Sequence, residues 1–375
     1  MKKVWDKWTR IALVKRILVG LILGAVLGIA VPQATGIAIL GDVFVSALKA
    51  IAPLLVFFLV ISSLCNAGKS HGGVIKTVII LYMFSTVLAA VIAVFASMAF
   101  PVKMTLANAA TDTSAPQGIV EVLNNLLLNV VANPVSSLVN ANYVGILMWA
   151  VLLGLAFRVA DKMTKKVLAD VADGISMVVT WIINLAPFGI FGLVFNTVST
   201  NGLDIFTTYG KLLILLVGCM LFIYFVTNPL LVYWCIRQNP YPLIFQCLKR
   251  SALTAFFTRS SAANIPVNMK VCEEMGLDRD TYSVTIPLGA TINMDGAAIT
   301  ITVMTMATAF TLGIHVDIPT AIILSLLAAL SACGASGVAG GSLLLIPMAC
   351  SLFGISDDIS MQVVAVGFII GVVQD

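Results

Sequence analysis

The sequence predicts an all-α polytopic membrane protein, with about eight transmembrane helices and two re-entrant helical hairpins. Three observations support this. Of the 375 residues, 60% are hydrophobic and 10% are charged, with a mean hydropathy of +1.07. So few charges cannot cover the surface of a soluble globule of this size. The basic residues gather in alternate loops, and polar runs interrupt the apolar segments of the C-terminal third.

Six apolar segments in the first two thirds of the chain approach the ~20 residues that a helix needs to cross a bilayer. The predicted helices span residues 17–34, 43–66, 74–100, 140–158, 174–200 and 210–236. The basic N-terminal arm lacks a small-residue cleavage site, so the first helix is expected to be uncleaved. Residues 101–140 are more polar and predict an external loop followed by a short amphipathic segment.

The distribution of basic residues predicts the sidedness of these helices. Only three of the 21 Lys and Arg residues, Lys49, Lys103 and Lys211, fall outside the N-terminal arm and the loops after the second, fourth and sixth predicted helices. The positive-inside rule therefore places the N-terminus in the cytoplasm. Sidedness accounts for the net charge of +4 better than a nucleic-acid partner does.

Residues 282–310 are apolar and long enough to cross a bilayer, yet a polar run from Thr291 to Gly296 lies at their centre. Asp295 is about 20 Å from the start of the segment, near the middle of a ~30 Å hydrocarbon layer. An unpartnered carboxylate there costs about 3 kcal/mol, so it should be protonated, paired or bound to a cation. Gly289 and Gly296 would let the helix unwind and turn carbonyls toward an ion. The alternative is a packing kink with a buried, hydrogen-bonded Asp295.

Two further segments predict hairpins. Residues 318–356 carry no charge and are too long for one span, and their middle, SACGASGVAGGS, is a poor helix former. Two half-length helices meeting there would form a re-entrant hairpin, although a small-residue packing face is an alternative. Residues 243–268 are apolar at both ends with a polar interruption, and the chain should break near Pro266.

The C-terminal third is therefore predicted to contain a hairpin and a helix, followed by a second hairpin and a second helix. This is one unit repeated, and one hairpin would enter from each side of the membrane. Inverted repeats with broken helices are typical of secondary transporters. The last apolar run, residues 361–375, is shorter than the ~20 residues of a span. The end of this helix, and any ligand after Asp375, are therefore expected to be missing from the sequence.

Three motifs carry a family resemblance: TRSSAANIP at 258–266, PLGATINMDG at 287–296 and SACGASGVAGG at 331–341. They resemble the hairpin tips and seventh helix of the dicarboxylate/amino acid:cation symporters, and the chain is most similar to the bacterial sodium-coupled serine/threonine symporters. The resemblance covers essentially the whole chain. It implies a homotrimer in membrane lipid whose transport cores move like elevators. Residues 1–375 would form one domain, with scaffold helices mainly within 1–73 and 101–236 and the transport core in 74–100 and 243–375.

The resemblance also implies site residues. Ser260 and Ser261 would contact the substrate carboxylate and Asp375 its amino group. Acidic amino acid carriers have Thr after NMDG where this chain has Ala297, which favours a neutral substrate. The substrate-binding set is Ser260, Ser261, Ala297, Ala335, Ser336, Gly337 and Asp375. The sodium-binding set is Tyr82, Ser85, Thr86, Gly289, Thr291, Asn293, Asp295, Ala332, Cys333 and Ala335.

The predicted function is sodium-coupled import of small neutral amino acids, serine and threonine, across the bacterial inner (cytoplasmic) membrane. Sodium is the coupling ion, and no other cofactor or transition metal is expected. Carboxylate, amide and carbonyl oxygens are the hard ligands that sodium prefers. The alternatives are a sodium- or proton-coupled symporter of acidic amino acids or dicarboxylates, and a channel-like pore. An enzyme is disfavoured because the spans contain no Ser/His pair, HExxH motif or paired catalytic carboxylates.

Overall fold

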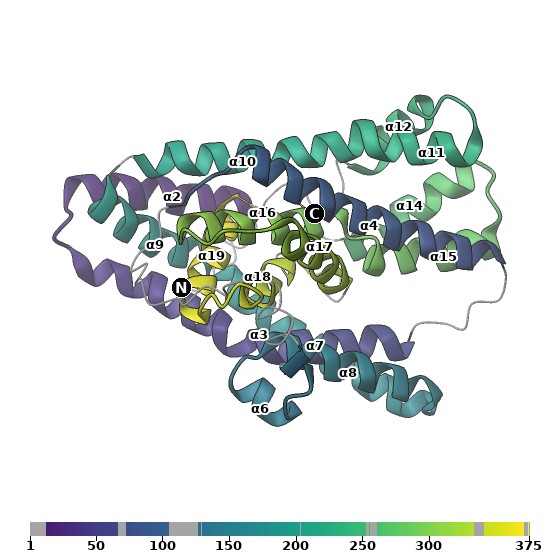
Figure 1. Ribbon diagram of the computed structural model, residues 1–375, viewed down its shortest axis with the longest axis horizontal. Helices are drawn as coiled ribbons and strands as arrows, with labels where there is room; N and C mark the ends of the chain where they lie inside the picture. Colours follow the sequence, from purple (N-terminus) through teal and green to yellow (C-terminus); the bar gives the residue numbers. More distant parts are fainter. Residues whose placement is uncertain are drawn as a thin grey trace, which may run out of the picture.

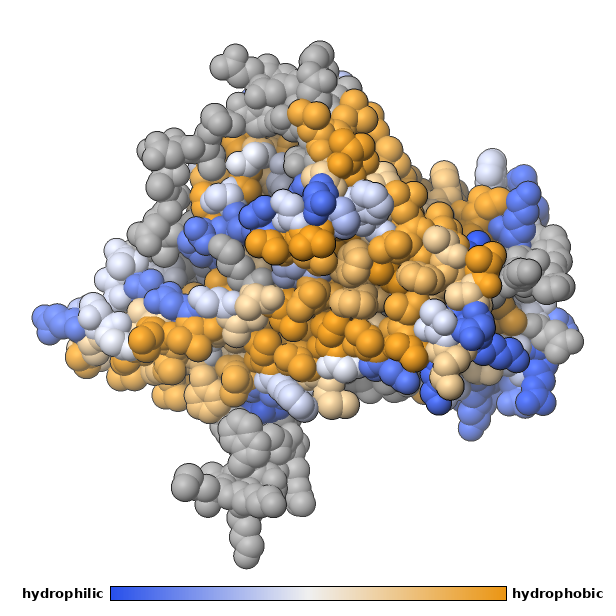
Figure 2. Space-filling view, turned by 90° about the horizontal axis from the view of Figure 1, so that it is seen from below, coloured by the Kyte–Doolittle hydropathy of each residue, from blue (hydrophilic) through white to orange (hydrophobic). Residues whose placement is uncertain are grey.

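The computed structural model describes residues 13–66, 73–104, 127–128, 130–202, 204–252, 255, 261–333, 341–370 and 374. Every secondary-structure element in these ranges is a helix. Five helical segments are long and apolar enough to cross a membrane: 35–62, 76–99, 162–184, 209–236 and 281–311. Figure 2 shows hydrophobic residues across the middle of one face and hydrophilic residues toward its ends. These features agree with a multi-pass membrane protein.

A first group of helices is built around α3. Its members are α2 (Leu13–Ala30), α3 (Ile39–Asn66), α7 (Tyr143–Ala156), α8 (Lys162–Asn184) and α9 (Ala186–Asn201), with the short α6 (Pro134–Val139) against α7. Helix α3 packs against α7, α8 and α9, and α2 packs along α9 (Figure 1).

The contact between α2 and α9 depends on a stripe of glycines. A Cβ atom added at Gly20, Gly24 or Gly28 would lie 2.2, 2.6 or 3.0 Å from a backbone oxygen of α9. Small residues at one helix face let two backbones approach closely, which favours van der Waals packing within a membrane. The spacing of four residues places all three glycines on one face of α2.

A second group surrounds α16. It contains α4 (Gly73–Ala99), α10 (Asp204–Phe222), α15 (Arg279–Ile292), α16 (Asp295–Thr311), α17 (Ile318–Ala332), α18 (Ile346–Ser351) and α19 (Asp357–Ile370). Helix α16 is buried from Ala297 to Ala309 and packs against α4, α10, α17, α18 and α19 (Figure 1). Helix α10 continues through a π-helical turn, Ile223–Thr227, into α11 (Asn228–Ile236), where Pro229 cannot donate a backbone hydrogen bond.

The first predicted hairpin consists of α12 (Tyr241–Cys247), a π-helical turn (Leu248–Ala252) and α14 (Ser261–Glu274). The Ser251 hydroxyl joins its two arms, because it accepts a hydrogen bond from Asn264 and donates one to Asn268, each 2.5 Å long. The expected break at Pro266 is wrong, since Pro266 lies inside α14. A proline removes only one helical hydrogen bond, and the two asparagine contacts hold the helix on either side of it.

The second predicted hairpin has α17 as its first arm, and its second arm is the 3₁₀ turn Gly341–Leu345 followed by α18. The two arms pack against each other. Most of the glycine-rich middle, residues 334–340, lies outside the described residues.

Other predicted boundaries need correction. The predicted helix 174–200 is two helices, α8 and α9, which are separated at Leu185 because Pro187 interrupts the backbone hydrogen-bond ladder. Helix α8 begins at Lys162, so the lysines expected in the preceding loop occupy its first turns. The charged residues 270–280 that follow the first predicted hairpin are largely helical, since α14 continues to Glu274 and α15 begins at Arg279. The other predicted helices are found close to their expected ranges.

Candidate functional site

The central segment is broken at the polar run, as the sequence predicts. Helix α15 ends at Ile292 and α16 begins at Asp295. Asn293 (φ −101°, ψ 78°) and Met294 (φ −115°, ψ 52°) lie between them in non-helical conformations. A helix end leaves its last carbonyl oxygens without helical partners and carries partial negative charge. The break therefore presents carbonyl oxygens beside the Asp295 carboxylate.

Two hydroxyl groups of α4 lie against this break. The Ser85 hydroxyl donates to one carboxylate oxygen of Asp295 at 2.7 Å. The Thr86 hydroxyl lies 3.1 Å from the other carboxylate oxygen and 3.4 Å from the Asn293 side-chain oxygen. It also accepts from the Met294 backbone N–H at 3.3 Å. Both α4 side chains are buried, so the polar groups form a cluster inside an apolar bundle.

Tyr82 on α4 and Thr291 on α15 lie farther along the contact between these two helices. The Tyr82 hydroxyl donates to the Thr285 carbonyl at 3.3 Å, and its ring packs on Gly289, where an added Cβ would lie 2.9 Å from the ring. Gly289 is therefore required for the close approach of α4 and α15. The Thr291 hydroxyl turns back to the Leu288 carbonyl at 2.8 Å. The Thr291 hydroxyl therefore donates its proton within its own helix, and its lone pairs and the Thr291 backbone oxygen are the groups left to act as ligands.

The end of α17 reaches the break from another side. The Cys333 thiol lies 3.3 Å from the Ile292 carbonyl oxygen and 3.6 Å from the Met83 sulfur. Ala332 is fully buried, and Ala297 is buried in the first turn of α16. Ser261 begins α14. The predicted residues Ser260, Ala335, Ser336, Gly337 and Asp375 lie outside the described residues.

Gln374 is a neighbour of this site that the sequence motifs did not indicate. A Cβ atom at Gly296 would lie 2.1 Å from the Gln374 carbonyl oxygen, so the backbone at residue 374 touches the start of α16. The Gln374 side chain is buried, and its amide atoms have no hydrogen-bond partner among the described residues. Its position directly before Asp375 is the one sequence signal that could have identified it.

The cluster therefore combines one carboxylate, one amide oxygen, two hydroxyls and the Ile292 carbonyl. Hard cations bind to such oxygen ligands. A cation there would offset the cost of placing a carboxylate within a membrane span.

Residues 13–374 match the sodium:dicarboxylate symporter family. The chain belongs to this family. Its membership identifies a membrane transporter with sodium as the coupling ion. A protein of Bifidobacterium adolescentis, named serine/threonine transporter SstT, is 58% identical over 100% of this chain and 87% of its own length. Two proteins of the same name from strains of Streptococcus thermophilus are 54% and 55% identical, over 100% of this chain and 94% of their own lengths.

In a sodium:dicarboxylate symporter, a helix broken beside a buried carboxylate is a suitable place for ion coupling. The two hydroxyls on α4 and the polar groups at the break come from segments about two hundred residues apart in the sequence. An ion bound between them would stabilise the packing of α4 on α15 and α16, and its binding would then favour one conformation of these helices.

Proposed function

We propose that this protein is a sodium-coupled symporter that imports serine and threonine through the bacterial inner (cytoplasmic) membrane. The observation that carries the proposal is Asp295, which begins α16 at a helix break. Its carboxylate accepts a hydrogen bond from Ser85 and lies 3.1 Å from the Thr86 hydroxyl. Sodium would bind to these oxygens together with Asn293. The names of the close relatives support the substrate.

A neutral substrate is favoured by Ala297. This residue is buried in the first turn of α16 and has no hydroxyl to hold a second carboxylate. The substrate carboxylate would bind at Ser260, Ser261 and the tip residues 335–337. The contact between Gln374 and Gly296 supports a role for Asp375, the next residue, in holding the substrate ammonium.

The fold supports an elevator-type mechanism with two re-entrant hairpins. We assign the helices around α3 to a scaffold and those around α16 to a moving core, because the packing within each group is dense. Helix α10 packs on α4 and α16, so in this proposal it moves with the core. The protein would work as a homotrimer in membrane lipid, with its N-terminus in the cytoplasm.

Uptake into proteoliposomes tests the function. An inward sodium gradient should drive accumulation of labelled serine, and collapsing the gradient should abolish it. Unlabelled threonine should compete, whereas aspartate and glutamate should not. Potent inhibition by aspartate would favour an acidic-substrate symporter instead. Serine flux without accumulation against its own gradient would favour a channel-like pore.

A further inference from the structure

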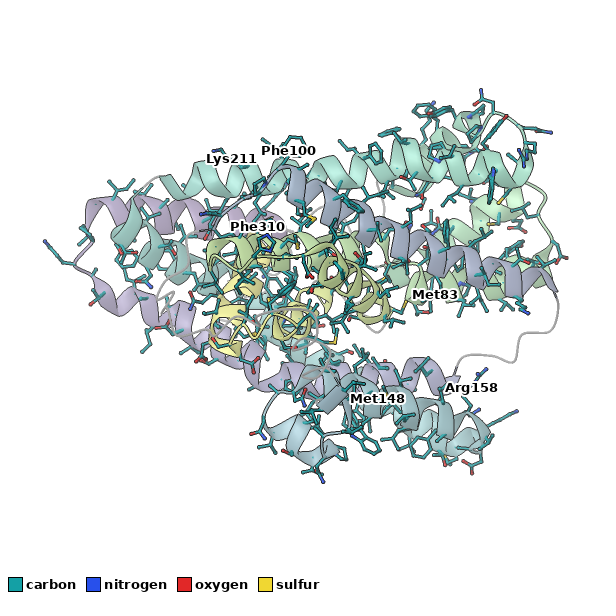
Figure 3. The ribbon with its side chains drawn as sticks, in the orientation of Figure 1. Met83, Phe100, Met148, Arg158, Lys211 and Phe310 are labelled. Carbon is teal, nitrogen blue, oxygen red and sulfur yellow. The ribbon has the colours of Figure 1, made fainter. Side chains whose placement is uncertain are left out.

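A cavity of about 850 Å³ lies between α4 and α10, and none of the ion-site side chains lines it. The end of α4 and the residues after it contribute Phe95 and Phe100, and α10 contributes Ile214, Phe222 and Lys211. The cavity is open on one side, because some of its lining side chains are exposed: Ile214 is 74% exposed and Phe100 is 68% exposed. Phe100 and Lys211 lie close together at the edge of the molecule (Figure 3).

The position of this cavity indicates that it opens to the hydrocarbon of a bilayer. Both walls belong to segments that can cross a membrane, residues 76–99 and 209–236. Exposed aromatic and aliphatic side chains around a hollow are typical of a binding surface rather than of a water-facing groove. The volume falls in the range of roughly 300–1,000 Å³ that ligand pockets have. An acyl chain matches such walls.

The charge at the cavity narrows the choice of ligand. Lys211 is the one charged side chain that lines it, and no ion pair of Lys211 is present in the described part of the chain. Lys103 directly follows Val102, which also lines the cavity. Of the three basic residues outside the N-terminal arm and the lysine- and arginine-rich loops, one therefore lines the cavity and a second is the chain neighbour of a lining residue. Lysines can extend from an apolar wall to the phosphate level of a bilayer, where anionic headgroups attract them.

We propose that this cavity binds an anionic phospholipid, with an acyl chain between α4 and α10 and the phosphate at the Lys211 ammonium. Helix α4 also carries Ser85 and Thr86, so the lipid would bind to the helix that supplies the hydroxyls of the ion site. The proposal does not depend on which amino acid is transported.

Two variants separate the headgroup from the chain. Lys211→Gln removes the cation and keeps a long polar side chain, and Lys166→Gln on α8 is its control. Gly218 lines the cavity and an added Cβ there meets nothing within 4 Å, so Gly218→Phe should fill the cavity without a clash. Gly174 on α8 is equally open, and Gly174→Phe is the matched control.

Native mass spectrometry of delipidated protein, titrated with phosphatidylglycerol or phosphatidylcholine, measures the binding. Wild-type protein and both controls should bind one phosphatidylglycerol per protomer more tightly than phosphatidylcholine. Lys211→Gln should weaken the binding of phosphatidylglycerol by about fivefold and leave the binding of phosphatidylcholine unchanged. Gly218→Phe should remove the site for both lipids.

Three results would overturn the proposal. Equal affinity of wild-type protein for the two lipids would show that no cationic headgroup contact exists. Unchanged phosphatidylglycerol binding in both variants would place the lipid elsewhere. Wild-type protein that binds neither lipid would show that the cavity is not a lipid site.

Discussion

At the scale of single residues, the Thr86 hydroxyl contacts several groups of the proposed ion site. Its nearest acceptor is the Tyr82 carbonyl on its own helix, at 3.0 Å. When its single proton is donated there, its lone pairs remain available to the Met294 N–H and to a cation. The same oxygen lies 3.1 Å from the Asp295 carboxylate. Thr86 therefore connects α4 to both sides of the helix break.

Replacement of this hydroxyl should weaken sodium binding. Thr86→Val keeps the shape of the side chain and removes the oxygen, so the sodium concentration for half-maximal serine uptake should rise about tenfold or more. Thr86→Ser keeps the oxygen and should stay within about threefold of wild type. Equal sodium dependence in the two variants would mean that the hydroxyl has only a packing role.

Gly296 gives a second prediction at this scale. Because an added Cβ would lie 2.1 Å from the Gln374 carbonyl oxygen, Gly296→Ala must displace the backbone at residue 374. Overpacking costs about 1–3 kcal/mol, so apparent serine affinity should fall about tenfold or more in uptake assays. Gly174→Ala, at an open position, is the control. Wild-type affinity in Gly296→Ala would exclude residue 374 from the substrate site.

At the scale of the elements, the sequence predicted the features that composition determines. Asn293, Asp295 and Gly296 in an apolar span indicated a break, and the structure has it at Asn293 and Met294. The helix continues through Pro266, where a break was expected, and the hydrogen bonds of Ser251 with Asn264 and Asn268 hold it there. The spacing of apolar residues in the sequence does not reveal these bonds.

Other parts of the site depend on the tertiary structure. The contact of Gln374 with Gly296 could not be predicted because it joins the first turn of α16 to a residue beyond the end of α19, and no sequence spacing relates the two. The split between α8 and α9 had a local signal, Pro187, but one proline does not distinguish a kink from a helix end.

The glycine stripe of α2 predicts how the first helix group is held together. Gly24→Leu would place a side chain against backbone only 2.6 Å from its Cβ, so α2 must separate from α9. We expect a thermal unfolding midpoint several degrees below wild type, measured in detergent by intrinsic fluorescence. Gly174→Leu should leave the midpoint nearly unchanged, because nothing lies within 4 Å of its Cβ. Equal midpoints for the two variants would contradict the packing role of the stripe.

At the scale of the whole molecule, α16 is the buried centre and α4 and α17 meet at its broken end. The Cys333 contact with Ile292 places the end of α17 beside the break between α15 and α16. Residues 334–340, which follow, connect α17 to the 3₁₀ turn at Gly341. A ligand that binds a closed conformation of this region more tightly than an open one will shift the population toward the closed conformation.

The small, glycine-rich run at residues 331–342 predicts a lid over the substrate. A single cysteine at Ser336, with the native cysteines replaced, should react more slowly with a membrane-impermeant maleimide when sodium and serine are both present. Sodium with aspartate is the control and should not slow the reaction. The same labelling rate under all conditions, with transport intact, would show that the tip does not close over the substrate.

The most direct test of the sodium site at the α15–α16 break is the sodium dependence of serine uptake by Asp295→Asn. This change keeps the size of the side chain and removes its charge. Reconstituted Asp295→Asn should insert normally but need at least about tenfold more sodium for half-maximal uptake, because a charged ligand is lost from a dry site. An unchanged sodium requirement at wild-type uptake rates would contradict the assignment of Asp295 as a sodium ligand.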